Sequence, residues 1–161
     1  MKELLTALIF SLATTVWAGD FEDGMAASKR GDNKTAFSFF KKAAEQGDSE
    51  AQHLLGLFYD LGIGRFTQDS VEAVRWFKLA AEQGRANAQY NLGFMYKNGQ
   101  GVKQDYQEAA KWFSKAAEQG DANAQNLLGE MYSYVEGVKQ DYQEAAKWYR
   151  KAAEQGDANA Q

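Results

Sequence analysis

Acidic side chains are the residues of this 161-residue chain that could do acid–base chemistry, because they recur in pairs. Asp105 and Glu108 lie three residues apart, and so do Asp141 and Glu144. Two carboxylates can act as general acid and general base on either side of a scissile bond. The same spacing is also that of a helix N-cap followed by a first-turn glutamate, the capping box. Since the pair returns at each expected helix start, capping is the favoured interpretation.

Other catalytic and metal-binding patterns are weak. His53 is the single histidine and there is no cysteine, so neither a histidine cluster nor a thiolate metal site can be built. Ser38-Phe-Phe-Lys41 has the Ser-x-x-Lys spacing of serine β-lactamases, but the partner motifs Ser-Asp-Asn and Lys-Thr-Gly are missing. The sequence therefore predicts no catalytic residue, no cofactor and no metal site, and a chain that is not an enzyme.

The elements that position these residues repeat along the chain. Lys-Ala-Ala-Glu-Gln-Gly-Asp begins at Lys42, Lys115 and Lys151, and the variant Leu-Ala-Ala-Glu-Gln-Gly-Arg begins at Leu79. Successive copies start 36 or 37 residues apart. A period of this length is typical of helical solenoids, in which each repeat packs only against its neighbours.

Each repeat carries two helical patterns of small and apolar residues. Ala88, Leu92, Gly93 and Tyr96 share one helix face, and a second stripe contains Ala109, Trp112, Phe113 and Ala116. Glycines at the end of the second pattern, at positions 47, 84, 120 and 156, are expected to close that helix. The pattern predicts an all-α fold of antiparallel helix hairpins, with the tryptophans in the core.

These motifs resemble the Sel-one-like repeat family, a longer relative of the tetratricopeptide repeat. The resemblance rests on Ala-x-x-x-Leu-Gly-x-x-Tyr, a glycine loop, Asp-x-x-x-Ala-x-x-Trp and Ala-Ala-x-x-Gly, and it covers Asp48 to Asp157. It implies a right-handed α-α superhelix that acts as a non-catalytic adaptor. Secreted bacterial members of the family often serve the cell envelope or contacts with a host.

The repeat pattern divides the chain into segments. Three full repeats are expected at residues 48–84, 85–120 and 121–156, after an N-terminal capping helix pair at residues 19–47. Residues 157–161 match the start of an incomplete further repeat. The helix that bears Trp148 and Tyr149 would then have an uncovered flank, through which the C-terminal repeat could self-associate.

The first 18 residues have the pattern of a secretory signal peptide. A positive residue, Lys2, precedes an apolar stretch at residues 4–13, and Val16-Trp17-Ala18 offers small residues at the cleavage positions. We expect cleavage after Ala18, a periplasmic or secreted bacterial protein, and no stable membrane insertion afterwards. A net charge of −4 and a pI of about 5.1 disfavour nucleic acid as a partner.

The expected binding surface lies on the first helix of each hairpin. Side chains three residues before, two before, one after and four after the repeat glycine differ among the copies, so the core does not dictate them. By analogy with tetratricopeptide arrays they line the concave face, and the predicted contacts are His53, Leu57, Tyr90, Asn91, Phe94, Lys97, Asn126 and Glu130.

A face of this kind predicts a scaffold that binds a protein or peptide partner. Three alternatives stay open. The same residues could be an ordinary solvated surface, because single exposed apolar residues are common. The chain could instead bind or weakly hydrolyse cell-wall or β-lactam compounds, with Ser38 as the residue to test. It could also be a self-associating fragment of a longer repeat array.

Overall fold

The computed structural model describes residues 19–65, 67–134 and 137–156, and this part of the chain consists of helices and turns. A helix over residues 19–29 leads into α2 (Asn33–Glu45), and the later elements are α3 (Ser49–Leu61), the short 3-10 helix η1 (Ile63–Arg65), α4 (Ser70–Glu82), α5 (Ala86–Asn98), α6 (Tyr106–Glu118), α7 (Ala122–Tyr134) and α8 (Tyr142–Glu154). The predicted signal peptide and residues 157–161 lie outside the described residues.

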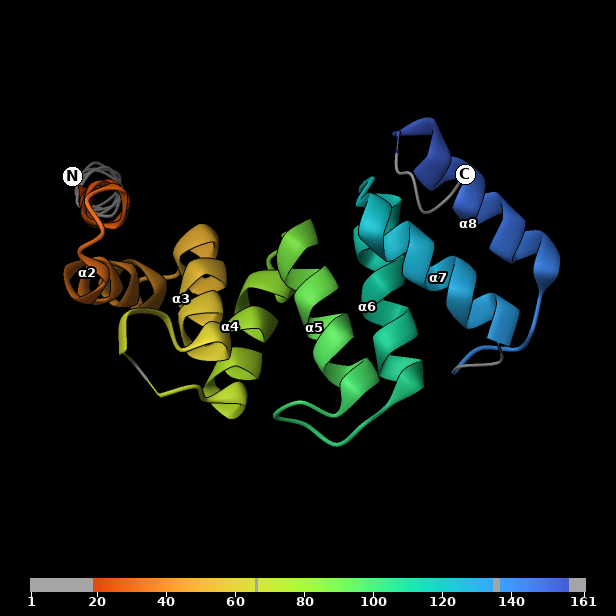
Figure 1. The fold of residues 1–161 in the computed structure, drawn as a ribbon, viewed down its shortest axis with the longest axis horizontal. Helices are drawn as coiled ribbons and strands as arrows, with labels where there is room; N and C mark the ends of the chain where they lie inside the picture. The colour runs from red at the N-terminus through yellow and green to blue at the C-terminus, as the bar shows by residue number, and fades with distance from the viewer. Residues whose placement is uncertain (1–18, 66, 135–136, 157–161) are drawn as a thin grey trace, which may run out of the picture.

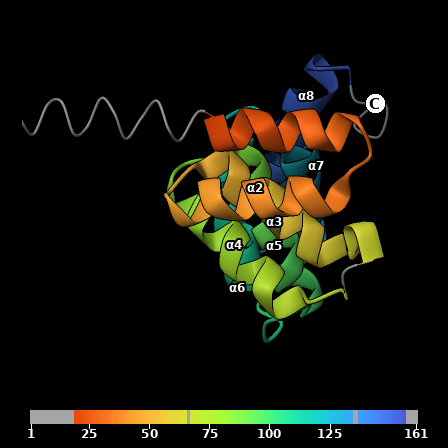
Figure 2. The same cartoon turned by 90° about the vertical axis from the view of Figure 1, so that its left-hand side faces the viewer.

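The helices form antiparallel hairpins that follow one another along an arc (Figure 1). Each helix packs mainly on the one before it and the one after it, as a solenoid requires. Figure 2 views the array from its N-terminal end, where residues 19–29 lie beside α2. The predicted all-α superhelix of helix hairpins is confirmed.

The aspartate of each carboxylate pair caps the second helix of its hairpin. Asp105 Oδ1 accepts the backbone N–H groups of Gln107 and Glu108 at 2.9 and 3.0 Å, and Asp69 and Asp141 do the same at their helices. The reciprocal half of the expected capping box is absent here. The Asp105 N–H donates to the carbonyl of Tyr96 in the first helix, so the cap also ties the two helices of the hairpin together.

The glutamates of these pairs have a different partner from the one that the capping box predicts. Glu108 pairs with Lys111 at 3.1 Å and Glu144 with Lys147 at 3.0 Å, each one turn along the same helix. Both pairs lie on the surface of a single helix, where an ion pair at this spacing stabilises the helix by about 0.2–0.5 kcal/mol.

The junction between α4 and α5 departs from the others. Asp48 and Asp121 cap α3 and α7 through the N–H groups of Ala51 and Ala124, but Arg85 stands at the corresponding position before α5 and makes no such bond. Asn87 takes over this role, because its Oδ1 accepts the N–H of Ala88 at 2.8 Å. Asn87 thus replaces the carboxylate that Asp48 and Asp121 supply at the other junctions.

A close contact between a glycine and an aromatic ring holds each hairpin together. A Cβ atom on Gly93 would lie 2.8 Å from Cδ1 of Phe113, which is too close for a real side chain. Equivalent contacts pair Gly56 with Phe77, and Gly129 with Tyr149. The N-terminal hairpin repeats the contact between Gly24 and Phe40, a similarity that its shorter turn hides in the sequence.

The tryptophans lie in the core between successive repeats, as predicted. Trp76 packs with Ala43 and Ala44 of the preceding hairpin, and Trp112 packs with the α4–α5 cluster around Phe77. All three repeat tryptophans are at most 8% exposed. The periodic tryptophans are therefore structural and do not form an open stacking surface.

Buried glutamines connect the hairpins in a ladder. The side-chain amide of Gln89, 4% exposed, donates to the carbonyl of Ala81 at 3.1 Å in the preceding helix. Its oxygen accepts the amide of Gln119 at 2.8 Å, and this amide also donates to the Gly84 carbonyl. Gln52 with Gln83 and Gln125 with Gln155 repeat the amide pair. Each junction thus satisfies its buried amide with uncharged groups.

The glycine–ring contact gives a direct stability prediction. Gly93→Ala should lower the free energy of unfolding by up to about 2 kcal/mol, because overpacking costs about 1–3 kcal/mol while alanine regains about 1 kcal/mol of helix propensity. Urea unfolding followed by circular dichroism measures the change. In a Phe113→Leu background the same substitution should cost less, since the ring is gone; a stabilising Gly93→Ala would contradict the contact.

Candidate functional site

The predicted binding residues lie on the first helices α3, α5 and α7, and we call this set of residues the first-helix face. Its members are His53, Leu57, Tyr90, Asn91, Phe94, Lys97, Asn126 and Glu130. Nε2 of His53 in α3 lies 3.0 Å from the side-chain amide of Asn91 in α5. Lys97 Nζ in α5 lies 3.6 Å from a carboxylate oxygen of Glu130 in α7. Side chains of the first helices of consecutive repeats therefore contact one another on this face.

His53 is a bridge between repeats. Its side chain is buried, and the Asn87 amide nitrogen lies 3.2 Å from Nδ1. Because the Asn87 oxygen already accepts the Ala88 N–H, Asn87 presents its NH₂ group to the ring, and Nδ1 must be unprotonated to accept it. The residue was expected to lie in a groove or on the surface; the structure places it beneath the face, where it joins α3 to α5.

The surroundings of His53 favour the neutral imidazole. Burial, together with the nearby positive charge of Arg85, lowers its pKa from 6.5 to about 4, while the Glu50 carboxylate acts in the opposite direction. Arg85 and Glu50 also form an ion pair at 3.1 Å across the same junction. The His53 contact between α3 and α5 is therefore uncharged at neutral pH, beside the Arg85–Glu50 ion pair.

Two aromatic rings occupy the centre of the face, with different roles. Tyr90 is half-buried and packs on the core ring of Phe113, with 5.9 Å between ring centroids. Burial raises the pKa of its hydroxyl. Phe94 lies 6.4 Å from Tyr90 between centroids and is 42% exposed, although it is apolar. Tyr90 thus supports the fold, and Phe94 is the ring offered to solvent.

A polar hollow of about 400 Å³ lies between α5 and α7. Its lining combines three predicted residues with two others: Tyr90, Asn126 and Glu130, together with Asn123 and Leu127. Leu127 stands two residues before Gly129, a position that the sequence pattern already marked, whereas Asn123 lies in the first turn of α7, outside the marked positions. The hollow offers amide donors and acceptors beside an apolar wall.

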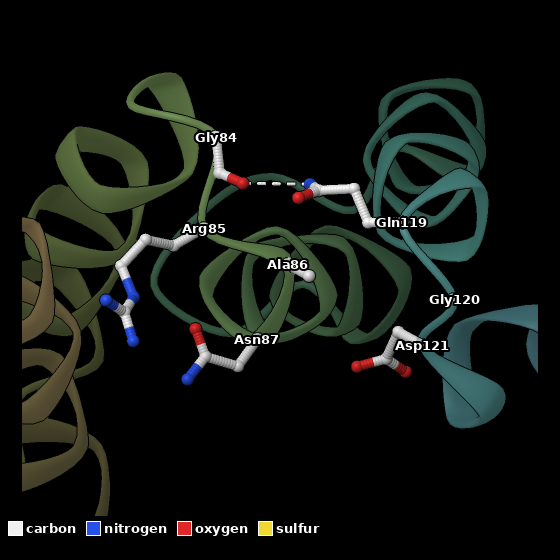
Figure 3. A pocket seen from close by; sticks show the side chains of 7 residues that line it. All are labelled: Gly84, Arg85, Ala86, Asn87, Gln119, Gly120 and Asp121. Atoms are coloured by element: carbon white, nitrogen blue, oxygen red, sulfur yellow. Dashed lines mark hydrogen bonds between the residues drawn. The ribbon is translucent and has the colours of Figure 1, made fainter.

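A second hollow, of about 510 Å³, lies where two repeat junctions approach each other (Figure 3). Arg85 extends away from this space toward α3, where it pairs with Glu50. Asp121 caps α7, and the Gln119 amide donates to the Gly84 carbonyl at 2.8 Å. The polar groups around this hollow thus have partners within the fold, and they serve the junctions.

Ser38 and Lys41 lie on the surface of α2. The Ser38 hydroxyl donates to the backbone carbonyl of Lys34 at 3.1 Å, and Lys41 lies 3.9 Å from Glu45. Among the described residues, no three histidine or acidic side chains gather at a spacing that could hold a metal ion. None of the described helices has the length and apolar character needed to cross a membrane.

The fold defines a class of protein, an α-helical repeat solenoid built of helix hairpins. A Sel1 repeat model matches residues 21–48, 49–84, 86–121 and 122–157, so the chain belongs to the Sel1 repeat family. Sel1 repeat proteins are generally non-catalytic scaffolds for protein–protein interactions. No curated protein matches the chain.

Several solved structures are similar to this chain. A protective antigen of uropathogenic Escherichia coli is 39% identical, with a TM-score of 0.86, over 91% of this chain and 32% of the antigen. A Sel1 repeat protein from Oxalobacter formigenes is 36% identical, with a TM-score of 0.85, over 98% of this chain and 66% of its own. Cysteine rich protein B of Helicobacter pylori is 29% identical, with a TM-score of 0.60, over 75% and 91%. The chain therefore spans about a third and about two thirds of the length of the first two proteins.

The environment of His53 predicts acid sensitivity. The folded-state pKa of about 4 lies below the ordinary 6.5, so the stabilisation by the neutral ring is complete above pH 6.5 and is lost as the pH falls toward 4. Urea unfolding at pH 7 and pH 4.5 should show a larger loss for the wild type than for His53→Gln. Because the chain has one histidine, its single ring Hε1 NMR signal reports the pKa; a midpoint near 6.5 in the folded protein would refute the assignment.

Proposed function

We propose that the chain is a non-catalytic scaffold that binds an extended segment of a partner protein along the first-helix face. The observation that carries the proposal is the exposure of Phe94, a large apolar ring at the centre of the face. Aromatic residues that combine exposure in the free protein with neighbouring packed side chains are frequent binding hot spots. Phe94 has this arrangement, because Tyr90 and the core ring beneath it hold its surroundings in place.

The polar residues around Phe94 suit a peptide backbone. Asn126 and Asn123 line the adjacent hollow, and asparagine side chains both donate and accept hydrogen bonds. An extended segment exposes N–H and C=O groups that such amides can satisfy. The pair formed by Lys97 and Glu130 places both charge signs beside the hollow, which suits a segment of mixed polarity.

The proposed site of action is the bacterial periplasm or the cell exterior. Support for this location comes from the signal-like pattern of residues 1–18. The negative net charge disfavours nucleic acid as the partner. A partner in the envelope, or a protein met outside the cell, fits this location.

The binding proposal predicts that Phe94→Ala will reduce partner capture by roughly tenfold or more, as expected for an aromatic hot spot. The mature chain from Gly19 would serve as bait in envelope extracts of the source bacterium, with quantitative mass spectrometry as the readout. Phe94 is a better choice than Tyr90, whose loss would disturb packing on Phe113. The melting temperature should stay nearly constant.

The matched control is Tyr142→Ala, which removes an exposed aromatic ring from α8 instead of the first-helix face. It should retain the partner that the wild type retains. Equal recovery of that partner by the wild type and Phe94→Ala would refute the first-helix face as the binding surface.

The location proposal predicts that the exported protein begins at Gly19. Intact-mass measurement of the protein recovered from a periplasmic extract should show the loss of residues 1–18. Ala18→Arg, which places a long charged side chain at the cleavage position, should leave the precursor uncleaved. A full-length wild-type mass in the cytoplasmic fraction alone would refute this location.

A further inference from the structure

An apolar pocket lies at the N-terminal end of the array, between the helix over residues 19–29 and α3. Its volume is about 210 Å³. Met25 and Ser28 contribute from the first of these helices, and Leu54 and Leu57 from α3. Phe40 and Phe58, which also line the pocket, are buried and lie 5.9 Å apart between ring centroids. The walls of the pocket are therefore mainly apolar and supported by packed rings.

The pocket belongs to the same surface as the first-helix face. Gly24 contacts Phe40 as Gly93 contacts Phe113, so these glycines are equivalent positions. Met25 and Ser28 then stand one and four residues after the repeat glycine, where Phe94 and Lys97 stand in the second repeat. Leu57, a predicted contact, is shared by the face and the pocket. A segment that lies along the first-helix face would reach this pocket at the N-terminal end of the array.

The size and lining of the pocket suit one side chain. Sites for small-molecule ligands and cofactors usually enclose about 300–1,000 Å³, so this volume falls below their range. Met25 is 36% exposed, and an unbranched methionine can adjust to the shape of an apolar group. A leucine or phenylalanine side chain is an occupant of suitable chemistry for these walls.

Three positively charged residues are close to pocket residues in the sequence. Lys29, Arg30 and Lys34 are exposed and lie beside the pocket residues Ser28 and Asn33 in the chain.

A single carboxylate lies among these three cations. Asp32 is engaged as the N-cap of α2, where it accepts the Thr35 N–H at 3.1 Å. Within the part of the chain that the structure describes, the ion pairs include none of these three cations. Over residues 29–34 the positive side chains outnumber the one carboxylate, so a carboxylate of a bound segment near this turn would meet an excess of positive charge.

Resting on the proposed function, we propose that this pocket anchors the partner segment through a leucine- or phenylalanine-sized side chain that is followed by an acidic residue. The apolar side chain fills the space between Met25 and Leu57. The adjacent carboxylate faces the cations at the turn between the helix over residues 19–29 and α2. The rest of the segment continues along α3 and α5 toward Phe94. The first-helix face thus binds an apolar side chain and its acidic neighbour at one end. At the other end its asparagine amides hydrogen-bond the backbone of the segment.

Methionine methyl NMR tests the pocket directly. The probe is the synthetic peptide Gly-Ser-Gly-Leu-Asp-Gly-Ser, titrated into the mature chain labelled with ¹³C at its methionine methyl groups. We expect a saturable shift of the Met25 methyl signal, while Met95 and Met131, at most 2% exposed, stay unchanged as internal references. Peptides with Ala in place of Leu, or Lys in place of Asp, should bind at least about tenfold more weakly. Equal shifts with all three peptides, or no Met25 shift, would overturn the inference.

Two variants separate the apolar and the charged parts. Ser28→Trp should fill the pocket and abolish the Met25 response to the Leu-Asp peptide. The triple variant Lys29→Glu, Arg30→Glu, Lys34→Glu changes exposed side chains only, and it should shift the preference to the Leu-Lys peptide even if Ser28→Trp fails to fold. An unchanged peptide preference in the triple variant would overturn the charged half of the proposal.

The capture experiment distinguishes this inference from the proposed function. Partner capture that depends on Phe94 but is unaffected by a folded Ser28→Trp variant would overturn the pocket and leave the scaffold proposal standing. A specific Met25 response together with capture that is indifferent to Phe94 would support the pocket and refute the proposed role of Phe94.

Discussion

The close approach of a first-helix glycine to an aromatic ring of the second helix is the contact on which each hairpin depends. Because the ring occupies the space that a Cβ atom would need, the two helices can lie close together only where the glycine stands. The contact fixes which side of the first helix faces inward. Leu92, just before the glycine, packs in the core, whereas Phe94 and Lys97 after it owe their place on the first-helix face to Gly93.

The features that the sequence predicts well are local or periodic. The repeat period, the N-caps such as Asp105 and the helix-closing glycines follow from residue types within a few positions of each other. Two other features depend on partners far along the chain. His53 is buried because Asn87 and Asn91 reach it from 34 and 38 residues away, and the glutamine ladder pairs residues about 30 apart. An isolated glutamine pattern does not reveal such pairing, because glutamines on helices usually face water.

The candidate site was predictable as a set of positions but not in the roles of its members. Tyr90 and Phe94 look alike in the sequence, yet one packs on Phe113 and the other faces solvent. The two junctions across the face also differ. His53 joins α3 to α5 through buried neutral groups, whereas Lys97 joins α5 to α7 through a partly exposed ion pair with Glu130, which salt will screen.

The glutamine ladder has a consequence for how such a protein can change its length. Each buried glutamine donates to the helix behind it and accepts from the helix of its own hairpin, so every junction presents the same pair of groups to its neighbour. A duplicated hairpin would meet complementary groups on both sides, and a deleted one would leave two ends that still fit. Duplication or deletion of a repeat in the gene can thus lengthen or shorten the array while the glutamine contacts at the joints are kept.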